Sequence, residues 1–156
     1  MGLAGGSIAG ACAIGVAGAL TFRAWLGLLI PLGLFLVLAY NLELAGGRFH
    51  SDLWFGLAWG GFPVVCGYAA VAGDSGGVTV LAAGFAVLVS LAQRALSSHV
   101  RHLRRRVVAV RGELERADAS REPLDVRRLT APAETGLRLL SVATVVLAAT
   151  LVAYRI

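Results

Sequence analysis

The stretch GGVTVLAAGFAVLVSLAQ, residues 76–93, decides the fold of this chain. It carries no charged residue, and its length is close to the roughly 20 residues that an α-helix needs to cross the hydrocarbon core of a bilayer. Four other apolar stretches have comparable length and no charge in their central parts: 3–22, 25–42, 53–72 and 136–154. The sequence therefore predicts about five membrane-spanning helices.

The composition supports this interpretation. Of the 156 residues, 58% are hydrophobic and 15% are charged, and the mean hydropathy is +0.78. A soluble domain has about a quarter charged residues, and a disordered chain has low hydrophobicity, so both classes are excluded. We expect an all-α, polytopic transmembrane helix bundle located in the cell membrane.

All 14 basic residues are arginines, and nine of them fall between His99 and Thr135 together with six acidic residues. Because arginine-rich loops stay on the cytoplasmic side of a membrane, we expect this segment to be cytoplasmic. Five spans then place the N-terminus in the cytoplasm and the C-terminus outside. The first ten residues contain no positive charge, so they do not resemble a signal peptide, and we expect the first span to be retained.

The expected organisation is four spans in 1–98, a basic cytoplasmic segment in 99–135 and a fifth span in 136–156. Within the basic segment, residues 107–126 suggest a short β-hairpin around Asp118, with a frayed helix as the alternative. Thr130, which precedes Pro132 and Glu134, is the expected N-cap of the last helix.

Small residues predict close helix packing at two places. Gly5, Ala9, Ala13 and Ala17 recur at helical spacing in the first span, and Gly56 and Gly60 form a GxxxG pair in the third. Pro63 predicts a kink in the third span, which forms either a cavity wall or a packing kink. Such faces also predict a homo-oligomer or a membrane-protein partner.

Polar residues at the cytoplasmic ends of two spans are candidates for a functional site. Tyr40 and Asn41 end the second span, and Gln93 and Arg94 end the fourth. They either line the mouth of an intramembrane pocket that binds a lipid phosphate or pyrophosphate, or they only terminate helices in the headgroup layer. Arg101, Arg104, Arg105 and Arg106 continue the fourth span, and we expect the first three of these to contact lipid phosphates.

Neither catalytic nor metal-binding motifs are found. His99 and His102 have no carboxylate or cysteine at ligand spacing, and Cys12 and Cys66 lie in apolar runs as expected core residues. We therefore expect no catalytic residue, no metal and no cofactor. Because the basic segment lacks a dense cationic stripe with aromatic residues, we also expect no nucleic-acid partner; membrane lipids are the expected partners.

One part of the chain resembles a known family. YNLEL (residues 40–44), a short polar loop and LWFGLAWGGFPVVCGYAA (residues 53–70) resemble the middle of the UbiA-type intramembrane prenyltransferase superfamily. The resemblance implies an α-helical fold that transfers a prenyl chain from a prenyl pyrophosphate to an acceptor. In this family two cytoplasmic aspartate-rich motifs hold magnesium and the pyrophosphate.

The chain departs from the family at these motifs, because no acidic residue occurs between Gln93 and Val107. Magnesium requires hard oxygen ligands, which arginine cannot supply. We therefore expect a shortened, diverged relative that does not catalyse the reaction alone and that has a packing or lipid-contacting role. The alternative is a prenyltransferase subunit, in which a partner chain supplies the aspartates and magnesium for a shared prenyl-pyrophosphate pocket.

Overall fold

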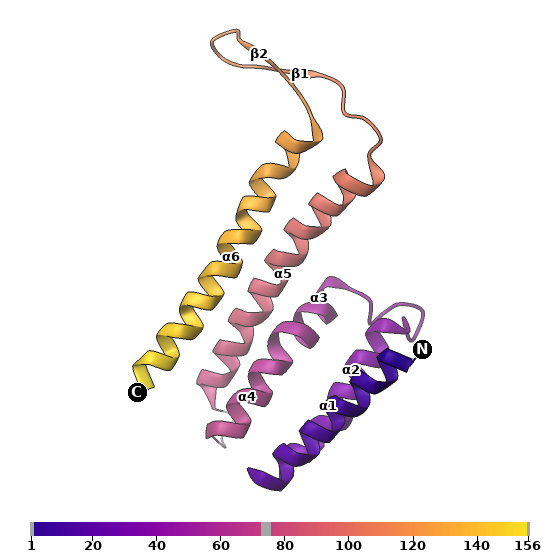
Figure 1. Cartoon of the computed structure of the whole chain (residues 1–156), viewed down its shortest axis with the longest axis vertical. Helices are drawn as coiled ribbons and strands as arrows, with labels where there is room; N and C mark the ends of the chain where they lie inside the picture. Colours follow the sequence, from indigo (N-terminus) through magenta and orange to yellow (C-terminus); the bar gives the residue numbers. More distant parts are fainter. Residues whose placement is uncertain (1, 73–75, 156) are drawn as a thin grey trace. The chain divides into compact units, whose positions relative to one another are not determined.

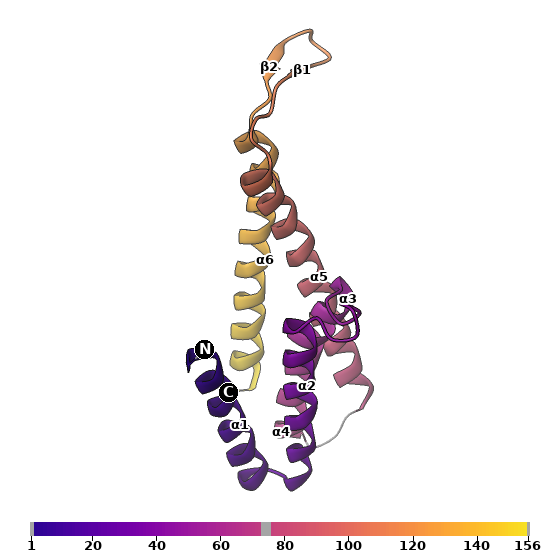
Figure 2. The same ribbon diagram turned by 90° about the vertical axis from the view of Figure 1, so that its right-hand side faces the viewer.

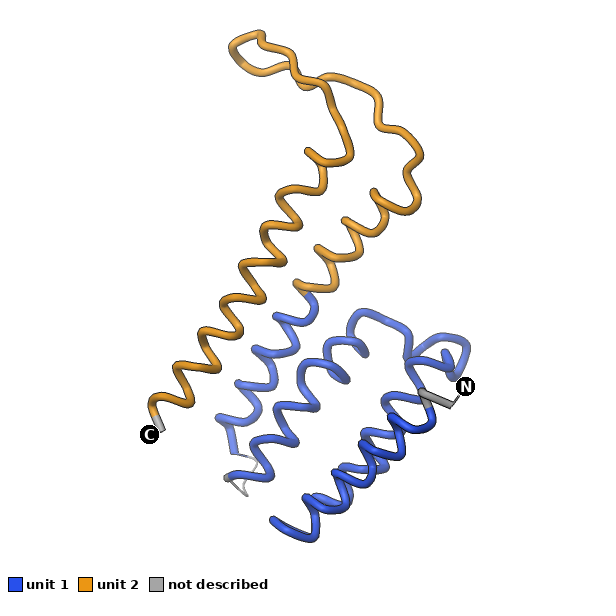
Figure 3. Tube along the Cα trace, in the orientation of Figure 1, with its two compact units in different colours: residues 1–91 blue, residues 92–156 orange. Residues whose placement is uncertain are grey.

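The computed structural model describes residues 2–72 and 76–155. The chain divides into two compact units, Met1–Leu91 and Ala92–Ile156, coloured separately in Figure 3. A single long helix, α5 (Gly77–Arg106), begins in the first unit and ends in the second. Each unit is described below by itself.

Unit 1 consists of helices joined by short connections (Figure 1). Its elements before α5 are α1 (Gly2–Thr21), the 3-10 helix η1 (Ala24–Leu28), α2 (Leu29–Asn41), α3 (Asp52–Phe55), the π-helix η2 (Gly56–Gly61) and α4 (Phe62–Ala72). The turn at η1 reverses the chain, so that α1 and α2 run side by side (Figure 2).

The third predicted span contains an irregular segment at the predicted position, but the backbone change is a π-helix rather than a simple proline kink. Residues Gly56–Gly61 widen the helix, and Pro63, which has no N–H to donate, follows directly after the wider turn in α4. A Cβ atom built on Gly60 would lie 2.5 Å from the Ala86 carbonyl oxygen of α5. The predicted packing role of Gly60 is therefore confirmed.

The core of unit 1 contains Ala19, Leu26 and Ala69, which form one buried cluster. Helix α1 packs within the unit through the face that carries Ala19 and Gly15, whose added Cβ would lie 3.0 Å from Ile30. The predicted stripe of Gly5, Ala9, Ala13 and Ala17 is exposed instead. That prediction was wrong for unit 1, because both faces of α1 are apolar and small residues alone do not decide which one is covered.

Unit 2 contains the last part of α5, the strands β1 (Glu113–Glu115) and β2 (Arg121–Pro123), and α6 (Val126–Arg155). The strands pair antiparallel with Leu114 opposite Glu122, which confirms the predicted hairpin. The ends of the connection are also joined, because the Leu124 N–H donates to the Gly112 carbonyl oxygen at 3.0 Å.

The predicted start of the last helix was wrong. Helix α6 begins at Val126, and Thr130 is a fully buried residue inside it whose Oγ1 donates to the Arg127 carbonyl oxygen. Asp125 is the cap, since its Oδ1 accepts from the Arg128 N–H at 2.6 Å. Asp125 is as good a capping residue as threonine, and Pro132 is accommodated within the helix.

The fold is all-α and polytopic, as predicted. Four helical stretches are long and apolar enough to cross a membrane: Ala24–Asn41, Asp52–Val71, Gly77–Arg106 and Val126–Tyr154. The first predicted span is also helical, as α1, and its apolar stretch Gly5–Thr21 is shorter than these four.

Candidate functional site

An aromatic cluster surrounds Tyr40 at the end of α2. The ring of His50 stacks on Tyr40 with centroids 4.5 Å apart, and the rings of Phe55 and Trp59 lie 6.0 and 6.1 Å away. The Nδ1 atom of His50 lies 3.1 Å from the Tyr40 carbonyl oxygen, so this nitrogen carries the proton. The loop between Tyr40 and His50 is thus anchored to the end of α2.

The polar pair Tyr40 and Asn41 belongs to unit 1, whereas Gln93 and Arg94 belong to unit 2. Asn41 Nδ2 donates to the Val37 carbonyl oxygen at 2.8 Å and therefore satisfies its own helix end. Gln93 and Arg94 are half-buried on α5, where the apolar part of that helix ends. The structure defines each pair within its own unit.

The three predicted lipid-contacting arginines of α5 have different surroundings. Arg104 pairs with Glu134 of α6 at 2.6 Å, and Arg101 donates to Ser98 Oγ on its own helix at 3.2 Å. Arg105 is exposed. The sequence therefore predicted the basic helix end, but it did not distinguish an arginine that joins two helices from one that faces solvent.

The last turns of α5 and the first turns of α6 lie side by side and form a two-helix stem (92–106 and 126–138). A Cβ on Gly136 would lie 3.2 Å from Leu96 Cδ1, and His99 Nε2 contacts the Leu129 carbonyl oxygen at 3.4 Å. Thr130 and Ala133 are buried. Figure 1 shows the β-hairpin beyond the end of this stem.

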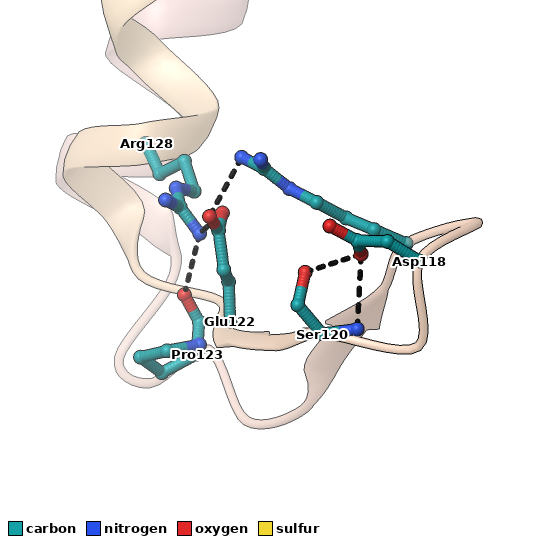
Figure 4. Close-up of polar contacts among 6 residues, drawn as sticks. Asp118, Ser120, Glu122, Pro123 and Arg128 are labelled. Atoms are coloured by element: carbon teal, nitrogen blue, oxygen red, sulfur yellow. Dashed lines mark hydrogen bonds and ion pairs between the residues drawn. The ribbon is translucent and has the colours of Figure 1, made fainter.

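Glu122 holds the hairpin to α6. One of its carboxylate oxygens pairs with Arg116 at 2.6 Å, and the other pairs with Arg128, whose Nη1 also donates to the Pro123 carbonyl oxygen (Figure 4). A weaker pair at 3.7 Å joins Glu115 and Arg121. The hairpin arginines are therefore largely neutralised by the hairpin's own acids.

The turn of the hairpin is closed by Asp118. Its Oδ1 accepts from the Ser120 hydroxyl at 2.6 Å and from the Ser120 N–H at 3.0 Å (Figure 4). These two hydrogen bonds, the hydroxyl first, lower the pKa of the Asp118 carboxyl below its usual value. The turn is therefore favoured above the unfolded-chain pKa of Asp118, and this contribution is lost as the pH falls through the lower folded-state pKa.

Unit 1 contains an apolar cavity of about 590 Å³. It lies among α1, α2, η2 and α4, and its lining includes Trp59, Phe62, Pro63 and both cysteines, Cys12 and Cys66. The sequence left open whether the irregular third span forms a cavity wall or a packing kink. It has both roles, because its glycines pack on α5 and its other residues line the cavity.

The sequence did not point to His50, Glu122 or Arg128 as residues of these sites, and it indicated Glu134 only as part of a helix start. Glu134 and Arg104 lie 30 positions apart, so no local spacing signals their pairing. A local signal did exist for Glu122, because Arg116 lies six residues before it, across the predicted turn, and Arg128 lies six residues after it.

No group of three or more histidine, cysteine, aspartate or glutamate side chains suited to a metal occurs within residues 2–72 and 76–155. The chemistry that remains is cationic, at the stem, and apolar, at the cavity. Comparison of the chain with protein-family models, curated proteins and solved structures found no match.

Proposed function

We propose that the chain is a membrane protein of UbiA-like descent that has no catalytic activity alone and contacts anionic lipids through arginines at the base of the stem. Its observed basis is the exposure of Arg138, where α6 leaves its apolar part, and of Arg101, about two turns past the end of the apolar part of α5. Within the described residues, neither has an acidic partner. The contact of Leu96 with Gly136 places Arg138 level with Arg94, so Arg101 lies about two helical turns farther from the apolar part of the helices than Arg138 does.

The cytoplasmic orientation of the stem belongs to the same proposal. It is supported by the nine arginines between His99 and Thr135, whereas only Arg23 and Arg155 would lie outside. Long arginine side chains near the hydrocarbon boundary extend toward the headgroups, where phosphate oxygens accept their hydrogen bonds. A packing role toward a second copy or another membrane protein is compatible with this lipid contact.

The lipid contact predicts a selective loss in the double variant R101Q/R138Q. Each arginine near an anionic surface contributes about 1 kcal/mol, so removing both should reduce the preference for phosphatidylglycerol over phosphatidylcholine by roughly tenfold or more. The preference can be measured with spin-labelled lipids bound to the full chain in vesicles.

Two controls accompany this measurement. The variant R101K/R138K should keep the preference within about twofold if charge alone matters, and R105Q/R106Q, which removes the same charge farther along α5, should reduce it less than R101Q/R138Q does. An unaltered lipid preference in R101Q/R138Q would contradict the proposal.

A second candidate function is favoured by the cavity of about 590 Å³ in unit 1, whose apolar lining suits an isoprenoid chain. In that case the chain supplies the prenyl pocket of a two-chain prenyltransferase, and a partner supplies aspartates for magnesium. An adjacent gene that encodes further helices with DxxxD motifs would favour this candidate.

We expect the purified chain to transfer no prenyl group when prenyl pyrophosphate, an aromatic acceptor and magnesium are present. The reason is the absence of acidic residues between Gln93 and Val107, where the family's second motif belongs. Product formation can be followed by mass spectrometry. Turnover that disappears when a chelator is added would contradict the non-catalytic proposal and direct attention to Glu43 and Asp52.

A further inference from the structure

The charges of unit 2 are separated in a way that the sequence does not show. Four arginines, Arg104, Arg116, Arg121 and Arg128, pair with acidic side chains of the stem or the hairpin. Asp118 and Asp125 accept hydrogen bonds from the backbone, and Glu113 lies in β1. Most acidic side chains of unit 2 therefore form ion pairs or hydrogen bonds within the hairpin or between the helices.

Besides Arg101 and Arg138, four other arginines of unit 2 are exposed and, among the residues that the structure describes, have no acidic partner. They are Arg105, Arg106, Arg111 and Arg127, and we call them the stem-tip patch. Arg105 and Arg106 end α5, Arg111 lies in the connection to β1, and Arg127 lies in the first turn of α6. All four belong to the end of the stem that carries the hairpin.

Two ion pairs fix the backbone segments that carry the stem-tip patch relative to one another. The Arg104–Glu134 pair joins the two helices, and Glu122 joins the hairpin to Arg128, directly beside Arg127. Beside Arg127, an open hollow of about 870 Å³ runs along α6 from Pro123 to Leu139. A preorganised cationic surface binds an anionic partner with a smaller loss of side-chain entropy than a flexible tail.

The length of α5 is sufficient for this patch to extend past the lipid headgroups. Its 30 residues span about 45 Å, whereas the hydrocarbon core is about 30 Å thick and each headgroup layer about 6 Å. If Gly77 lies at the outer edge of the core, Arg105 lies about 10 Å past the inner edge even at a tilt of about 20°. In this placement Arg101 lies in the headgroup layer, and the stem-tip patch extends past it.

We infer that the stem-tip patch binds an acidic polypeptide segment of a cytoplasmic protein. Charge complementarity requires an anionic partner, and the height of the patch favours a soluble one over the lipids of the same membrane. Single-stranded nucleic acid is disfavoured, because the described part of unit 2 contains no phenylalanine or tryptophan and a single tyrosine, Tyr154, at the far end of α6, so the large aromatic rings that usually stack on bases are missing near the patch. The inference depends on the cytoplasmic orientation proposed above.

The test uses the full chain in nanodiscs of phosphatidylcholine, with a fluorescent 20-residue polyglutamate as the probe and polyglutamine as the uncharged reference. Polyglutamate should bind, polyglutamine should not, and the affinity should fall as salt is raised because the contact is ionic. The variant R105Q/R106Q/R111Q/R127Q should bind polyglutamate at least tenfold more weakly, whereas R101Q/R138Q should change its affinity less than threefold.

Three results would overturn the inference. The first is that polyglutamate does not bind to the unaltered chain, and the second is that the stem-tip variant binds it equally well. The third is that this variant loses the preference for anionic lipid but still binds polyglutamate, which would show that the patch contacts the bilayer. A circular dichroism spectrum equal to that of the unaltered chain establishes that the variant is folded. Failure of the lipid proposal is separate, since it is read from R101Q/R138Q in vesicles.

Discussion

Replacing Gly60 by alanine is expected to destabilise unit 1 by about 3 kcal/mol, at the upper end of what overpacking usually costs. The new Cβ would lie 2.5 Å from the Ala86 carbonyl oxygen and 2.6 Å from Ser90 Oγ. The first of these atoms is backbone, so the clash cannot be relieved by a side-chain rotation. The π-helix and α5 must then separate, which a fall in the melting temperature in detergent would report.

Gly67→Ala is the matched control for this experiment. Gly67 lies in the next helix, α4, and a Cβ there would meet no atom within 4 Å. Alanine also favours a helix over glycine by up to about 1 kcal/mol, so this variant should be as stable as the unaltered chain or slightly more so. Equal stability of the Gly60 and Gly67 variants would contradict the described packing of η2 on α5.

Ala133→Leu is expected to open the stem. Ala133 is 7% exposed, so three further carbon atoms have no space between α5 and α6, and overpacking of this kind costs about 1–3 kcal/mol. The disturbance should weaken the nearby Arg104–Glu134 pair and the His99 contact with Leu129. Faster amide hydrogen exchange in the first turns of α6 would be the direct sign.

Ala131→Leu provides the comparison, because Ala131 is exposed on the same helix and adds the same atoms without meeting α5. Its hydrogen exchange should match that of the unaltered chain. If both leucine variants exchange alike, the two helices do not pack through Ala133. The helix packing that fixes the arginines of the stem-tip patch would then be contradicted as well.

The spans were predictable because their signal is local and strong. Eighteen residues without a charge, as in 76–93, have few alternatives to a membrane helix, and the same holds for the other long apolar stretches. The hairpin was also predictable, since its turn residues follow β-branched ones within twenty positions. In each case neighbouring residues determine the outcome.

Features that depend on long-range pairing were not predictable. The small-residue stripe from Gly5 to Ala17 was expected to pack, yet within unit 1 a different face of α1, which carries Gly15 and Ala19, is covered. The pairing of Arg104 with Glu134 likewise depends on the register of two helices, which no spacing in the sequence fixes. The start of α6 was not predictable from Thr130 either, because Asp125 is an equally good capping residue about one turn earlier.

The most direct test of the account is the side of the membrane on which the hairpin lies. In a chain with Cys12 and Cys66 replaced by alanine, Ser120→Cys places a single exposed thiol in the hairpin turn, and Arg23→Cys places one in the expected outer link. A membrane-impermeant maleimide should label Ser120→Cys only from the cytoplasmic side and Arg23→Cys only from the outside. Labelling of Ser120→Cys from the outside would contradict the orientation, and with it both the lipid contact and the cytoplasmic partner of the stem-tip patch.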